Sequence, residues 1–144
     1  MSSYQVIALA LVLVVGLTVL LPAVASASVL GDALKVFGIA YVVRRFGGDI
    51  NKFINNVAGQ KGIVWEGTTK VVPIISAGSG LHVGAAQVQG PRDRVDDVRA
   101  VGQVETTISS LRGKLLVPVN TTNVTRRIER IQGVGVSALI DFRI

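Results

Sequence analysis

The chain has 144 residues, a single histidine, no cysteine and a net charge of +6. The absence of cysteine excludes a disulfide framework, thiolate catalysis and cysteine-ligated zinc or iron–sulfur sites. The positive charge favours an anionic partner, such as a phospholipid surface, a cell-wall polymer or nucleic acid, although it also serves ordinary solubility.

The N-terminal segment, residues 1–27, is predicted to be a signal peptide or a membrane anchor. Residues 1–31 carry no Lys, Arg, Asp or Glu, and an apolar run covers residues 6–21. Extended through the small residues that follow Pro22, this run reaches the roughly 20 residues that a bilayer core requires. The segment is therefore long enough either for export or for retention in a membrane.

The residues after this apolar run support opposite topologies. Two overlapping A-x-A patterns lie between residues 23 and 27, as at a signal-peptidase site. The basic n-region of a signal peptide is missing, however, and cations such as Lys35 and Arg44 follow the run. A retained helix with this asymmetry would place the domain in the cytoplasm. We expect cleavage near Ala25 or Ala27, which sends the domain to the cell envelope.

Residues 28–60 are predicted to form an amphipathic segment of one or two short helices. Apolar side chains recur at helical spacing over residues 29–43, and the two arginines at 44–45 suit a helix C-terminus. The two glycines at 47–48 are expected to break the helix, so that Asp49 caps a second one. The inner face of that second helix is expected to carry Ile50, Phe53, Ile54 and Val57.

This helical segment has two interpretations, which the pattern leaves open. In one, an ordinary helix packs against a sheet. In the other, the apolar stripe lies in a membrane interface with its cations at the headgroups, joined by the basic stretch at 126–130. The residues predicted to contact a membrane or anionic surface are Val36, Phe37, Arg44, Arg45, Lys52, Arg126, Arg127 and Arg130.

Residues 61–144 are predicted to form an antiparallel β domain, because the hydrophobic period changes here from helical to alternating. The fold class is therefore α+β, with a five- to seven-stranded antiparallel sheet or a small, partly closed barrel. A short helix between residues 90 and 100 should turn Val95 and Val98 inward. The predicted strands are 62–67, 69–78, 80–90, 98–109, 113–122 and 133–144, the last with the clearest alternation.

The motifs of common catalytic and metal sites are missing. His82 stands alone in an alternating strand, and the chain contains no GxSxG elbow for a nucleophile. The acids at Asp93, Asp96 and Asp97 alternate with arginines and fit a self-paired helix face better than a calcium site. We predict no catalytic, cofactor-binding or metal-binding residue and no small-molecule substrate.

The expected function is that of a non-catalytic, exported cell-envelope protein with a structural or interaction role. Its partners would be the membrane or envelope surface, together with further copies of itself or a partner protein. Two alternatives remain: a module that binds lipid or another anionic surface, and an uncleaved single-span subunit of a membrane complex. Nucleic acid is not expected, because aromatics are few and export would place it out of reach.

Overall fold

The computed structural model describes most of the chain, namely residues 33–34, 37–125 and 128–142. The predicted signal or anchor segment, residues 1–27, lies outside this part. So do three of the predicted contact residues, Val36, Arg126 and Arg127.

The chain forms two compact units, Met1–Gly38 with Phe142–Ile144, and Ile39–Asp141. In the described part of the first unit, the amide of Gly38 donates to the carbonyl of Leu34 at 3.1 Å. Gly38 has a φ of +85°, and the helical conformation is interrupted at this residue. The second unit contains α2 (Ile39–Gln60), α3 (Arg92–Asp96) and all the strands of the described chain.

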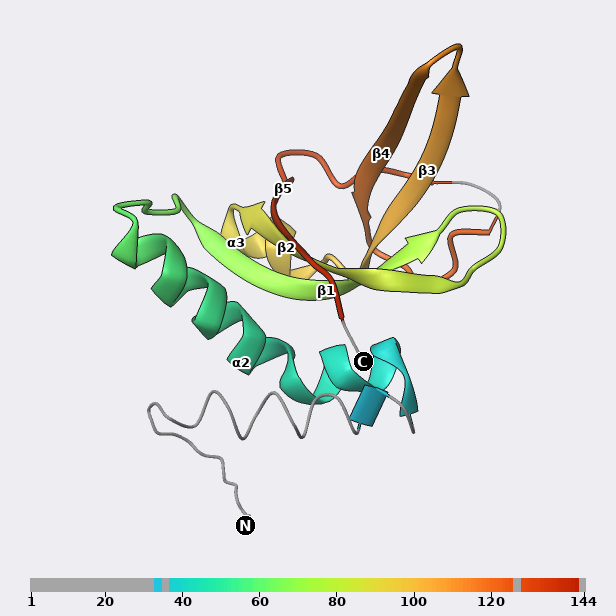
Figure 1. The fold of residues 1–144 in the computed structure, drawn as a ribbon. Helices are drawn as coiled ribbons and strands as arrows, with labels where there is room; N and C mark the ends of the chain where they lie inside the picture. The colour runs from blue at the N-terminus through green and yellow to red at the C-terminus, as the bar shows by residue number, and fades with distance from the viewer. Residues whose placement is uncertain (1–32, 35–36, 126–127, 143–144) are drawn as a thin grey trace. The chain divides into compact units, whose positions relative to one another are not determined.

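The second unit is built on one five-stranded sheet in the order β4-β3-β1-β2-β5 (Figure 1). Its strands are β1 (Thr68–Ser76), β2 (His82–Gly90), β3 (Ala100–Ile108), β4 (Leu111–Val119) and β5 (Gly135–Ile140). The sheet is mostly antiparallel, but β1 and β3 pair in parallel over 74–76 and 101–103. The fully antiparallel prediction is wrong at this pair. β2 ends beside the start of β1, and the connection through residues 91–99 starts β3 from that side, so β3 runs in the same direction as β1.

The sheet curls into a half-barrel, which confirms the predicted α+β class, and its five strands lie at the lower end of the predicted five to seven. Register shifts at Ile74/Ile75 and at Gln87/Val88 mark irregularities of the kind that bend strands. The segment between β4 and β5 returns against β4, where the amide of Ile131 donates to the carbonyl of Pro118 at 2.9 Å. Five of the six predicted strands lie close to their predicted positions; all five end earlier than predicted or at the same residue, and β1 and β4 begin one and two residues earlier.

Two apolar clusters fill the curled sheet. The larger one includes Val95 and Val98, both fully buried, which confirms their predicted inward orientation. Val95 belongs to α3 (Arg92–Asp96), so this short helix serves to cover the sheet. The full larger cluster is Val72, Ile74, Ala86, Val88, Val95, Val98, Val101 and Val134. The smaller cluster is Ile75, Ala100, Val119 and Val124.

Helix α2 (Ile39–Gln60) runs unbroken through the two glycines at 47–48, so the predicted break and the capping role of Asp49 are wrong. Glycine costs a helix about 1 kcal/mol relative to alanine, which packing readily outweighs. A Cβ on Gly47 would lie 3.5 Å from the carbonyl oxygen of Val71 on β1. This is an ordinary van der Waals distance, so α2 runs close to β1 here without needing a glycine at this position.

This continuous helix also changes which side of α2 faces the sheet. Ile50 is buried as predicted, but Phe53 is 59% exposed and Val57 is 41% exposed. The inner side is instead set by Gly47 and continues one turn later at Asn51. The prediction was wrong here because it assigned the inner side from apolar residues alone, whereas Asn51 and Asn55 lie against the sheet.

The predicted strand 62–67 is absent, and these residues form a turn and an irregular connection. Gly62 has a φ of +77°, and the amide of Ile63 reaches back to the carbonyl of Ala58 at 2.8 Å, which ends α2. Val64 is 86% exposed. The β-branched residues that suggested a strand therefore have no partner strand in the described chain.

Candidate interaction site

A buried polar cluster joins α2 to the sheet, and we call it the polar seam. Its centre is Gln87 on β2, whose side chain is fully buried. The Gln87 Nε2 donates to Oδ1 of Asn51 and to Oδ1 of Asn55, both at 2.9 Å. Its Oε1 accepts from Ser137 Oγ on β5 at 2.7 Å. Both asparagines then donate from Nδ2 to Thr69 Oγ1 on β1 at 3.0 Å.

The polar seam uses the hydrogen-bonding capacity of Gln87 within the protein itself. Both N–H groups of its amide have acceptors, and its oxygen has a donor. A network satisfied in this way positions α2 on the sheet and leaves no polar group of Gln87 for a ligand. Sequence reasoning missed the seam, although Asn51 and Asn55 stand four residues apart and so share a helix face.

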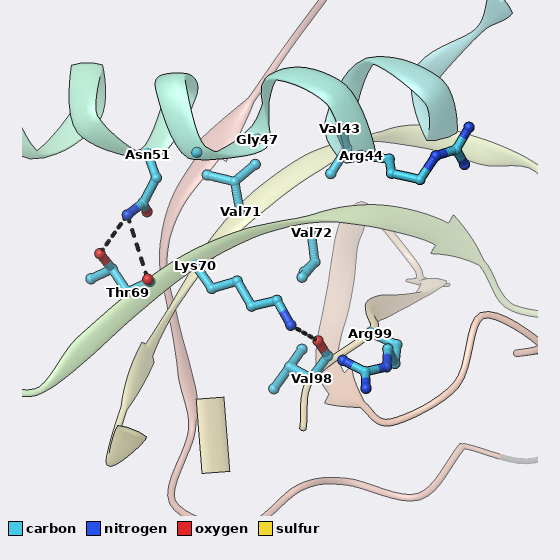
Figure 2. A pocket seen from close by; sticks show the side chains of 11 residues that line it. Val43, Arg44, Gly47, Asn51, Thr69, Lys70, Val71, Val72, Val98 and Arg99 are labelled. Carbon is cyan, nitrogen blue, oxygen red and sulfur yellow. Dashed lines mark hydrogen bonds between the residues drawn. The ribbon is translucent and has the colours of Figure 1, made fainter. Parts of the chain in front are cut away.

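A cleft of about 390 Å³ lies between α2, β1 and the segment that follows α3 (Figure 2). Lys70 extends from β1 and donates from Nζ to the carbonyl of Val98 at 2.7 Å and to that of Asp96 at 3.3 Å. Arg99 Nη1 donates to the same Asp96 carbonyl at 3.2 Å. Burial, and then the charge of Arg99, lower the pKa of the Lys70 ammonium below its ordinary value.

The cations of this cleft have a structural role. Lys70 and Arg99 satisfy backbone carbonyls at the C-terminal end of α3, where such groups lack helical partners. No aspartate, glutamate, histidine or serine lines the cleft. Among the described residues, the lining therefore contains no carboxylate base. The Thr69 hydroxyl accepts from Asn51 and Asn55, and the Lys70 ammonium donates to backbone carbonyls.

The predicted surface cations lie on separate elements. Arg44, Arg45 and Lys52 are exposed on α2, and Arg130 is exposed in the segment before β5. The guanidinium of Arg44 lies 5.6 Å from the ring centre of Tyr41, and that of Arg45 lies 5.3 Å from the ring centre of Phe46. Each arginine on α2 thus rests on an aromatic neighbour. Phe37, in the first unit, is 61% exposed.

Three further observations concern the single histidine, metal binding and membrane spans. His82 is exposed at the start of β2. Among the described residues, no three His, Asp or Glu side chains gather into a group able to hold a metal ion. In that same part of the chain, none of the helices is both long and apolar enough to cross a membrane.

The most unusual surface of the unit is the outer half of the β3–β4 hairpin, residues 105–115, which we call the arm. Every residue of the arm is exposed, whereas both strands are buried where they join the sheet. Figure 1 shows the arm projecting beyond the other strands of the sheet. In the described unit, it is a two-stranded ribbon whose faces are both left uncovered.

The two faces of the arm differ sharply in polarity. Residues paired across an antiparallel ladder point to the same side, and the side alternates along each strand. One face, continuing from Val104 and Leu115, ends in Ile108 opposite Leu111, which are 71% and 74% exposed. The pairs on this apolar face are Val104–Leu115, Thr106–Gly113 and Ile108–Leu111. The pairs on the polar face are Glu105–Lys114 and Thr107–Arg112.

The apolar face of the arm is continuous with the interior. By the same alternation it extends the side of β3 and β4 that carries Ala100 and Val119 of the smaller apolar cluster. The sequence predicted both strands but not the arm. An alternating sequence does not distinguish a strand whose apolar side is covered by the rest of the chain from one whose apolar side is exposed to solvent.

The described unit belongs to the class of α+β domains built on a curled, five-stranded sheet. No protein-family model, curated protein or solved structure matches the chain.

Proposed function

We propose that the chain is a non-catalytic interaction protein of the cell envelope, exported by its N-terminal segment, and that the arm is its binding surface. The arm carries this proposal because it exposes three large aliphatic side chains on one continuous face. These are Ile108, Leu111 and Leu115, and Leu115 is 59% exposed. Contiguous apolar surface of this kind marks interaction sites in soluble proteins.

The architecture of the arm adds a second reason. A two-stranded ribbon on its own is marginally stable in water, and it gains stability when one face is covered. The arm has no covering element within the described unit, and its apolar face is exposed along its whole length. A binding partner would supply the missing cover.

The cleft and the polar seam support a binding role over a catalytic one. In both, the polar groups are engaged with the protein itself, through Gln87 in the seam and through Lys70 in the cleft. Catalytic sites instead hold groups free to act on a substrate, often with a nucleophile and base within hydrogen-bond distance. Self-association into a homo-oligomer is also part of the proposal, with the apolar face of the arm as one part of the contact between copies.

The proposal is tested by binding of the full chain to isolated cell-envelope fragments. The arm variant Ile108→Ser with Leu111→Ser should lose at least about tenfold in affinity, since two large side chains no longer leave water. The matched control is Leu139→Ser, because Leu139 on β5 is 62% exposed and lies outside the arm. The N-terminal segment is common to all variants, so differences among them report the arm.

Two results would contradict the proposal. One is equal affinity and equal self-association, by sedimentation velocity, for the arm variant and the wild type. The other is enzymatic turnover that disappears with His82→Ala or with substitution of Asp93, Asp96 and Asp97 to asparagine.

A further inference from the structure

We propose that the partner of the arm is an anionic bilayer, into whose interfacial region the tip of the arm inserts. This inference rests on the proposed function, because it names the chemistry that the binding surface recognises. Its evidence is the order of side chains along the arm, from the tip toward the sheet.

The tip of the arm is apolar. Ile108 and Leu111 face each other across the ladder and enclose only the turn of Ser109 and Ser110. They are the most exposed aliphatic residues of the arm, at 71% and 74%. The hydroxyls of the turn are small and uncharged, so the tip has no formal charge to desolvate on entering the acyl boundary.

The cations of the arm lie behind this tip and on the opposite face. Arg112 follows Leu111 directly, and Lys114 stands three residues behind it, which is about 10 Å at strand rise. Interfacial segments bury their apolar side about 5–10 Å deep, so Lys114 would reach the headgroups when the tip is inserted. The long side chain of Arg112 can extend back to the same level.

The charge of this surface matches an anionic headgroup layer. Glu105, opposite Lys114, is the only acid of the arm. The arm therefore has a net positive charge, and so does the whole chain at +6. A lipid surface with acidic headgroups provides both an apolar interior for the tip and negative charge for the cations.

A second copy of the chain fits the arm less well. Stable protein interfaces bury roughly 1,200–2,000 Å² and involve roughly 20–30 residues on each side. The apolar face consists of three cross-strand pairs, one of them Thr106 with Gly113. Two arms packed face to face would thus form only part of such an interface, and the cations, which lie on the opposite face, would take no part in it.

The chain contains no cysteine, so single cysteines can be introduced as unique labelling sites. An environment-sensitive fluorophore is attached to Leu111→Cys in the full chain, which is then mixed with phosphatidylcholine vesicles with or without phosphatidylglycerol. With phosphatidylglycerol, the label should be quenched by a nitroxide on the lipid and protected from aqueous iodide. In phosphatidylcholine alone, iodide should quench it.

Two matched positions serve as controls in the same vesicles. Leu139→Cys places the label on β5, and Phe53→Cys places it on α2, at residues that are 62% and 59% exposed. Both labels should remain accessible to iodide. Because the readout is depth at one position, a membrane contact made by the N-terminal segment does not alter the comparison.

The contribution of the cations is measured with Arg112→Gln and Lys114→Gln. Each cation near an anionic surface contributes about fivefold to membrane partitioning, so the double variant should need about 25-fold more vesicle for half-maximal insertion. The corresponding pair on α2, Arg45→Gln with Lys52→Gln, should leave the titration unchanged. If the α2 pair shifts the titration and the arm pair does not, the arm is not the membrane contact.

Two outcomes overturn the inference in ways that can be told apart. If the label at position 111 is protected from iodide without lipid, and more so as protein concentration rises, the partner is another copy of the chain. The lipid inference then fails while the proposed function stands. If the label stays accessible to iodide with vesicles and with envelope fragments alike, the arm binds neither, and both proposals fail.

Discussion

The polar seam buries polar side chains, whereas the arm exposes apolar ones. In the seam, Gln87 is fully buried yet satisfied by Asn51, Asn55 and Ser137. In the arm, aliphatic side chains such as Leu111 are mostly exposed, although their strands are regular and well paired. Each region departs from the usual rule that apolar groups lie inside and polar groups outside.

The difference between them shows where each region finds its partner. A buried amide costs free energy unless hydrogen-bonded, and the seam meets that cost entirely within the chain. Exposed aliphatic side chains also cost free energy in water, and only contact with a partner removes that cost. We therefore expect seam variants to lose stability and arm variants to lose binding.

The largest effect is expected for Gln87→Leu. It removes the donor for the asparagine oxygens of the seam and the side-chain acceptor for Ser137, leaving polar groups without partners. We expect a loss of about 2–5 kcal/mol in the free energy of unfolding. Urea denaturation of the full chain, followed by fluorescence of the single tryptophan, Trp65, measures this loss.

The matched control for that variant is Gln89→Leu. Gln89 Nε2 donates to the carbonyl of Glu66 at 2.7 Å in an exposed bond two residues farther along β2. Water can replace this partner, so the loss should stay below about 1 kcal/mol. If the two variants lost equal free energy of unfolding, the seam would contribute no more to stability than an exposed hydrogen bond does.

A smaller effect is expected when one asparagine of the seam is removed. Asn51 and Asn55 bind the same two partners, Gln87 and Thr69, so each single alanine variant leaves one asparagine in place. We expect losses of about 1–2 kcal/mol singly, and a further coupling of about 1 kcal/mol when both are removed. Additive losses in this double-mutant cycle would refute the redundancy; Asn56→Ala, exposed on the same helix, is the control.

At the tip of the arm, Ser109→Gly should stabilise the hairpin. Ser109 has a φ of +56° and is the one non-glycine residue with positive φ among the described residues. An L-residue pays about 1–2 kcal/mol for this conformation, and the added backbone freedom of glycine offsets part of the relief. We expect the free energy of unfolding, measured by thermal denaturation, to rise by about 0.5–1 kcal/mol. Ser110→Gly, where φ is not positive, should give no gain.

The smallest change in stability is expected for the arm variant Ile108→Ser with Leu111→Ser. Both side chains already face solvent, so their loss removes little buried area, and the free energy of unfolding should change by less than about 0.5 kcal/mol. A loss as large as that of Gln87→Leu would mean that the arm is covered within the chain. That result would erase the contrast between the two regions.

Local sequence patterns were enough to predict much of the fold. Alternation and turn residues located β1 to β5, and Pro91 with the valines after it located α3. The errors fall where tertiary contact overrides local preference. Gly47 reads as a helix breaker, but α2 continues through it alongside Val71, and Phe53, which was predicted to face inward, is exposed.

The sequence by itself determined the α+β class, the order of the elements and the lack of cysteine chemistry, because these depend on composition and on short-range periodicity. Only the tertiary structure decided that Gln87 would be buried among amides and that Ile108 and Leu111 would be bare. β2 and the strands of the arm all alternate in the sequence. Alternation assigns each side chain to one face of the strand but does not show what packs against that face. That depends on where distant segments pack, and here α2 covers β2 while the arm extends beyond every cover in its unit.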